Sequence, residues 1–116
     1  VGRLPGDRRL INAMASTIAE TFPSVHIMDI PYTLNSIIYA TKQSTNEDFL
    51  SANFITLTDK GDTHPLLLDA MQTTWTYKQE GYENSTIFTD DKAPIEWITN
   101  DMILGFMLGG DVESLQ

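Results

Sequence analysis

The 116-residue chain contains no cysteine and only two histidines, His26 and His64. The missing thiols exclude disulfide bonds, thiolate metal sites and thiol catalysis. His26 falls inside a predicted buried strand, where the alternatives are a hydrogen-bonded core histidine and a ligand or base. His64 precedes a proline at a predicted helix start. Because neither histidine has partners at an interpretable spacing, the sequence predicts no metal site and no catalytic residue.

Basic residues are scarce as well, since seven lysines and arginines stand against 16 acidic residues and give a formal charge of −9. This balance argues against binding to nucleic acid, whose backbone requires a lysine- and arginine-rich surface. Three of the seven, Arg3, Arg8 and Arg9, lie close together near the N-terminus. The acidic excess is explained either by solubility or by long-range attraction of a polycation.

Long hydrophobic runs are also missing, and the longest, near 102–109, is far shorter than the roughly 20 residues of a membrane-spanning helix. The first nine residues are polar and basic, unlike a secretory signal. We therefore expect no membrane span in this chain and a cytoplasmic location. The 41% hydrophobic content suits a single domain or subdomain over residues 1–116.

The apolar periodicity, with the positions of prolines, glycines and capping residues, predicts helices at 8–21, 47–54, 65–80 and 94–108. Asp7 is the expected N-cap of the first helix, and Thr45 or Asn46 that of the second. Residues 58–63 are the strongest loop signal. The side chains expected to be buried in the last two helices are Leu67, Leu68, Met71, Trp75, Ile95, Ile98, Met102, Ile103 and Phe106.

Runs rich in β-branched residues predict strands at 25–30, 36–41 and 86–88. The first has apolar side chains on both faces, so we expect it to be buried on both sides. The five residues between the first two strands are too few for a parallel crossover, and these strands should pair antiparallel. Three strands are too few for an independent doubly wound sheet, but they suit the distal part of one.

The most distinctive string is TDDKAPIEW, from Thr89 to Trp97. Pro94 suits the first position of a helix, and Glu96 would lie in the first turn, where a carboxylate meets the positive end of the helix dipole. A turn and a helix cap are one explanation of Asp90 and Asp91. The alternative is that Asp90, Asp91 and Glu96 form a carboxylate cluster at a strand end, suited to binding an ammonium group.

This string resembles the TDD-x-APVEW segment near the C-terminal end of spermidine synthase-like proteins, some of which carry a membrane transporter-like domain ahead of the synthase-like one. Weaker similarity covers GRLPGD (2–7), NAMASTI (12–18) and FPSV (22–25), so the resemblance spans about 2–107. It implies an α/β fold, the C-terminal portion of a Rossmann-like, methyltransferase-type domain. An antiparallel β-hairpin and one short strand would be packed by three to four helices.

The resemblance also implies aminopropyl transfer from decarboxylated S-adenosylmethionine to a polyamine in the intact protein. The 30–36 turn is similar to a P-x-x-P-x-G segment of the polyamine pocket, with Leu34 and Asn35 at the second proline and the glycine. Asn35 is expected to keep the left-handed backbone conformation of that glycine. The candidate substrate-binding residues are Tyr32, Asp90, Asp91 and Glu96.

The family's cofactor-binding elements, a glycine-rich turn and acidic residues after the early strands, have no counterpart here. We therefore expect a C-terminal fragment without a cofactor site, inactive alone, whose partner is the missing N-terminal half of its domain. In a transporter-fused protein it would lie on the cytoplasmic side of the membrane. The alternative is a non-catalytic interaction module whose exposed apolar faces favour self-association as a homodimer.

Overall fold

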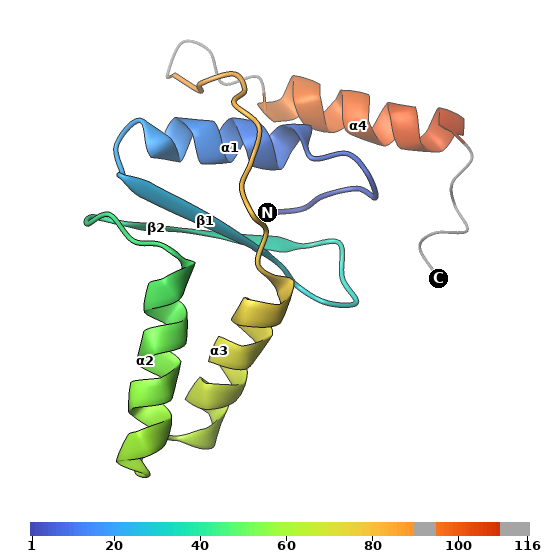
Figure 1. Cartoon of the computed structure of the whole chain (residues 1–116). Helices are drawn as coiled ribbons and strands as arrows, with labels where there is room; N and C mark the ends of the chain where they lie inside the picture. Colours follow the sequence, from blue (N-terminus) through green and yellow to red (C-terminus); the bar gives the residue numbers. More distant parts are fainter. Residues whose placement is uncertain (90–94, 110–116) are drawn as a thin grey trace.

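The computed structural model describes residues 1–89 and 95–109. The described elements are α1 (Arg9–Ala19), β1 (Ser24–Asp29), β2 (Ser36–Thr41), α2 (Glu47–Lys60), α3 (Pro65–Tyr77) and α4 (Ile95–Gly109). Figure 1 shows α1 covering one side of the β-hairpin and α4 lying beside α1. Helices α2 and α3 project as a pair from the other side. The chain is therefore a mixed helix-and-strand fold, as the sequence predicts.

Strands β1 and β2 form the predicted antiparallel hairpin, in which Ile27 lies opposite Ile38. Side chains alternate between the two faces of a strand. Accordingly, Ile27 and Ile38 pack with Ile11 of α1, whereas His26 and Tyr39 stack on the opposite face with ring centroids 5.2 Å apart. Burial of β1 on both sides is confined to its centre, because only Ile27 and the next residue, Met28, are buried.

Helix α1 is packed on two sides and holds the core together. Ile11 and Ala15 are buried against the hairpin, and Ala13 is buried against Ile98 and Met102 of α4. Alanine side chains are small, so a neighbouring element can approach the helix backbone closely. The hairpin, α1 and α4 therefore form three layers with α1 in the middle.

The structure corrects the predicted start of α1 and the predicted end of α2, and it ends α1 at Ala19, two residues early. The N-cap of α1 is Arg8 rather than Asp7, although Oδ1 of Asp7 accepts a hydrogen bond of 3.2 Å from the Arg9 amide. Helix α2 continues past 54 to Lys60, because the predicted loop 58–63 begins only where Gly61 adopts a left-handed φ of 75°. A helix can extend through polar residues when nothing in them breaks it.

The second predicted cap is confirmed, since the Asn46 side chain accepts a hydrogen bond of 3.0 Å from the Asp48 amide. Helix α3 begins at Pro65, as predicted, and ends at Tyr77, three residues early. The predicted helix 94–108 is seen as Ile95–Gly109, with Pro94 outside the described residues.

The predicted strand at 86–88 is absent from the structure. This segment runs irregularly beside α1, where the Ser85 amide donates to the Ser16 hydroxyl at 3.0 Å and the Phe88 amide to the Thr17 hydroxyl at 2.8 Å. Hydroxyl groups of α1 thus take the place of a neighbouring strand. The sheet in the described part of the chain consequently has two strands.

Most of the side chains that the sequence predicts to be buried in the last two helices are not buried. In α4 only Ile98 and Met102 are buried, and α3 has no buried residue. The molecule measures 51 × 36 × 19 Å with a radius of gyration of 16.8 Å, against about 13 Å for a compact domain of 100 residues. The chain is therefore extended, and apolar helix faces lie at its surface. None of its described helices is long and apolar enough to cross a membrane.

Candidate functional site

Asp29, the last residue of β1, is the centre of a polar network between three segments. Its carboxylate accepts hydrogen bonds of 2.9 and 3.2 Å from the two terminal nitrogens of Arg8. The Ser36 hydroxyl donates a third at 2.5 Å, and Nε of Arg3 lies 3.5 Å from Oδ1. Arg3 also donates to the Thr33 carbonyl at 2.9 Å. The network joins the N-terminal segment, the start of α1 and the hairpin turn.

Local structure explains why these residues meet. Asp29 is paired with Ser36 across the hairpin and has the same strand parity as Ile27, so its side chain is on the face toward α1. Arg8 immediately precedes α1. Partial burial by itself raises the pKa of Asp29, but the hydrogen bonds from Arg8 and Ser36 and the positive charges of Arg8 and Arg3 outweigh it. The pKa of Asp29 is therefore below its ordinary value, and the carboxylate is held ionised.

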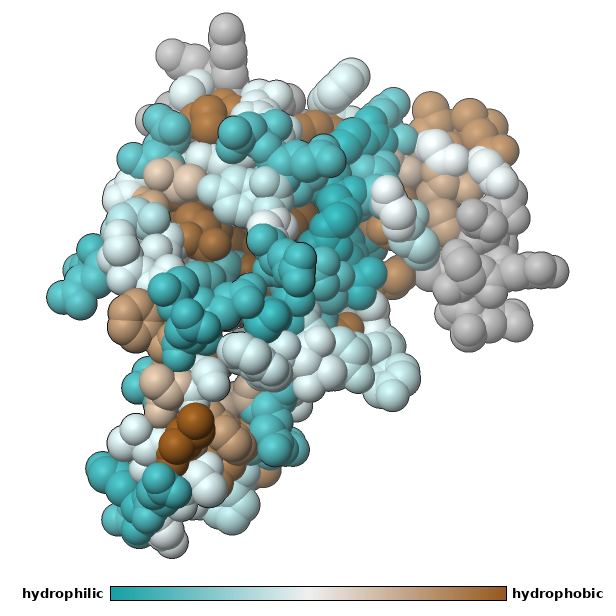
Figure 2. Space-filling view, in the orientation of Figure 1, coloured by the Kyte–Doolittle hydropathy of each residue, from teal (hydrophilic) through white to brown (hydrophobic). Residues whose placement is uncertain are grey.

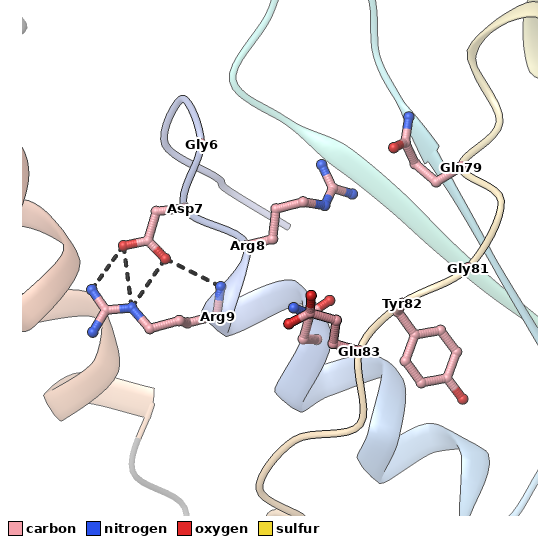
Figure 3. Close-up of a pocket in the computed structure, with 9 residues that line it drawn as sticks. Gly6, Asp7, Arg8, Arg9, Gln79, Gly81, Tyr82 and Glu83 are labelled. Carbon is pink, nitrogen blue, oxygen red and sulfur yellow. Dashed lines mark hydrogen bonds and ion pairs between the residues drawn. The ribbon is translucent and has the colours of Figure 1, made fainter.

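A depression of about 640 Å³ adjoins this network, between the start of α1 and residues 79–83. Figure 3 shows Arg9 turned toward Asp7, while Arg8 points toward the strands. Arg9 donates to Asp7 at 2.7 Å and also pairs with Asp101 of α4. The Arg9 hydrogen bond lowers the pKa of Asp7. Both arginines are thus paired with carboxylates, and these ion pairs brace the side of the depression formed by the start of α1.

The His26 ring has a hydrogen-bonding partner and lies in a strand. This agrees with the first of the two alternatives for this residue, a hydrogen-bonded histidine of the core. Its Nε2 lies 2.8 Å from the Thr45 hydroxyl, and its ring stacks on Tyr39. His64 caps α3, because its Nδ1 accepts a hydrogen bond of 3.1 Å from the Leu66 amide. Within residues 1–89 and 95–109, no group of three or more metal-ligating side chains is assembled.

Two of the four predicted substrate-binding residues, Tyr32 and Glu96, lie in the described part of the chain. Tyr32 lies at the tip of the hairpin turn with its side chain fully exposed, and Glu96 is exposed in the first turn of α4. Asp90 and Asp91 fall outside the described residues. The left-handed residue of the turn is Tyr32, with a φ of 60°, and not Asn35 as expected. Asn35 instead accepts a hydrogen bond of 2.9 Å from the Ile30 amide.

Sequence reasoning missed the Asp29 network. One signal was present, because a carboxylate at the end of an apolar strand must find partners when it is partly buried. The crowding of three arginines near the N-terminus was the matching signal.

Comparisons with protein-family models, curated proteins and solved structures find no match to this chain.

We predict that Asp29→Asn destabilises the fold by about 1–3 kcal/mol near neutral pH, because two partly buried guanidinium groups lose their charge partner. The folded pKa of Asp29 lies below its unfolded value of about 3.9, so its contribution is present above that pH and lost as the pH falls through the folded pKa. Urea unfolding of the variant should therefore show a flatter dependence on acid pH than the parent chain.

The matched control is Asp101→Asn, which removes the same charge from a more exposed pair with Arg9. It should change stability little, since exposed ion pairs contribute weakly. Equal losses in the two variants would contradict a special role for the Asp29 network.

Proposed function

We propose that this chain is the C-terminal, non-catalytic part of a spermidine synthase-like protein. The chain would lie in the cytoplasm, or on the cytoplasmic side of the membrane in a transporter-fused protein. There it completes the sheet of a Rossmann-like, methyltransferase-type domain and covers one side of the active site. The intact protein would transfer an aminopropyl group from decarboxylated S-adenosylmethionine to a polyamine. The TDDKAPIEW string suggests the family. The observation that carries the scaffold role is the outer edge of β2.

Backbone geometry shows that β2 has an outer edge for another strand. Antiparallel residues alternate between directing their N–H and C=O groups toward the partner strand and away from it. The Ser36 amide donates to the Val1 carbonyl at 2.8 Å, so it points away from β1. Ile38 and Ala40, two and four residues further along β2, direct their amides the same way.

Among residues 1–89 and 95–109, backbone pairing covers the outer edge only at its start. The N-terminal segment pairs there, through a bridge between Gly2 and Asn35 and a 2.8 Å hydrogen bond from the Arg3 amide to the Leu34 carbonyl. Within the described residues, no backbone partner from another segment reaches the outward amides of Ile38 and Ala40. An edge with unpaired amides is a template for a further strand, which is the role that the proposal assigns to it.

Helix α4 supports the proposal independently. Leu104 and Leu108 are 55% and 79% exposed, and Figure 2 shows apolar side chains gathered over the far end of this helix, at the upper right. Contiguous apolar surface of this kind is typical of an interface. An additional layer of the domain would cover it.

The reaction implied by the resemblance is attack of a neutral amine on the carbon beside a sulfonium centre. Carboxylates near the amine would orient it and help to remove its proton. On this proposal Asp90, Asp91 and Glu96 supply such groups, and Tyr32 contributes to the wall of the amine pocket. The sulfonium co-substrate would be held by the N-terminal half of the domain.

The competing function is a non-catalytic interaction module that self-associates as a homodimer. The same β2 edge and the same exposed α4 face favour it, because a second copy can cover them as well as another part of one domain can. Both functions make pairing at the β2 edge the central event. They differ in the natural partner.

We predict that the isolated chain self-associates, so that its sedimentation-derived mass rises above 13.0 kDa with increasing concentration. Ala40→Pro should lower this association while leaving the melting temperature nearly unchanged, because proline removes an amide that points outward. Thr41→Pro is the matched control, since its amide points toward β1 and its loss should destabilise the hairpin. A clean monomer at high concentration with cooperative melting would contradict the proposal.

We also predict that titration calorimetry of the isolated chain with decarboxylated S-adenosylmethionine or methylthioadenosine gives no binding heat. The physical reason is that the proposal leaves the nucleoside-binding elements to the other half of the domain. Binding of either compound at micromolar concentration would sink the assignment of a non-catalytic part. Such binding would not bear on pairing at the β2 edge, which the sedimentation experiment tests separately.

A further inference from the structure

We infer that the groove between α2 and α3 is a docking site for a basic amphipathic helix of another protein. This pair projects away from the three-layer core, and neither helix has a buried residue. The groove has a volume of about 490 Å³ and a largely apolar floor of Leu50, Phe54 and Trp75. Figure 2 shows brown hydrophobic side chains next to teal hydrophilic ones over the α2–α3 pair, at the lower end of the molecule.

The charges around the groove are mainly negative. From residue 47 to 77 the chain has five carboxylates and a single lysine, Lys60, at the far end of α2. Asp48 lies one turn from Ser51 on α2, and Asp69 lies one turn from Gln72 on α3, and both Ser51 and Gln72 line the groove. Residues three positions apart share a helix face. Asp48 and Asp69 are therefore on the rim, where basic side chains of a docked helix would meet them.

The upper end of the groove already holds an ammonium group of the chain itself. The Lys78 nitrogen lies 3.1 Å from a carboxylate oxygen of Glu47 and 4.8 Å from the centre of the Trp75 ring. A carboxylate and an aromatic face together are a favourable environment for a cation. This contact shows that a lysine side chain can lie against the aromatic and acidic groups at this end of the groove.

These features select a helix as the occupant. Two adjacent helices with an apolar seam accept a third helix, whose apolar face fills the seam while its polar face stays in solvent. The acidic rim favours a basic polar face and disfavours nucleic acid. The site lies on the α2–α3 pair and not on the β2 edge, so it stands or falls independently of the proposed scaffold role.

The test uses a 14-residue helical peptide of leucine and lysine, and the same peptide with glutamate in place of lysine. Trp97→Phe leaves Trp75 as the only tryptophan, because the chain has two. Trp75 is 43% exposed, so docking should shift its fluorescence to shorter wavelength. We expect this shift with the lysine peptide, weaker at high salt, and not with the glutamate peptide.

A pair of variants locates the site. Ser51→Arg places a positive charge in the groove and should weaken binding of the lysine peptide by roughly fivefold or more, corresponding to about 1 kcal/mol. Thr56→Arg adds the same charge to the exposed back of the same helix and should leave binding nearly unchanged. No fluorescence shift, equal binding of the two peptides, or equal weakening by the two variants would overturn the inference.

Discussion

The two-sided packing of α1 is the constraint on which the rest of the fold depends. One face of the helix places Ile11 and Ala15 on the hairpin, and the adjoining face places Ala13 on α4. A helix that is apolar around so much of its circumference is stable only when both sides are covered. The order of the layers follows directly from this distribution of side chains. Removing either neighbour would expose part of the core.

Polar contacts fix the ends of this layered core. The Asp29 network ties the N-terminal segment, the start of α1 and the hairpin turn at one point. The Arg9 ion pairs then join the start of α1 to α4. Because a partly buried carboxylate must be paired, these contacts specify which ends of the elements meet. Their contribution is to the arrangement of the elements.

The elements with strong local signals are predictable from the sequence. The apolar spacing of α1 and the short link between the strands predict the central helix and the antiparallel hairpin, and both are confirmed. The segment 86–88 has strand-forming residues, but a strand also needs a partner, and the Ser16 and Thr17 hydroxyls bind its backbone instead. Periodicity likewise predicts which helix face is apolar without showing what covers it.

The candidate site is less predictable, because its contacts join residues that are far apart in the sequence. Arg8 and Asp29 are separated by 21 positions, and Arg9 and Asp101 by 92. No local pattern links such pairs. By contrast, the resemblance drew attention to Tyr32, which lies exposed at the tip of a turn. The resemblance suggests a substrate role for Tyr32, and no local pattern in the sequence predicts this exposure.

The outer edge of β2 is the feature that connects this fold to its proposed role. Amide hydrogen exchange followed residue by residue by NMR tests it most directly. The isolated, dilute chain should exchange the outward amides of Ile38 and Ala40 much faster than those of Ile37 and Tyr39, which point toward β1. Equal, strong protection of all four amides would show that the edge is already paired and would contradict the scaffold role.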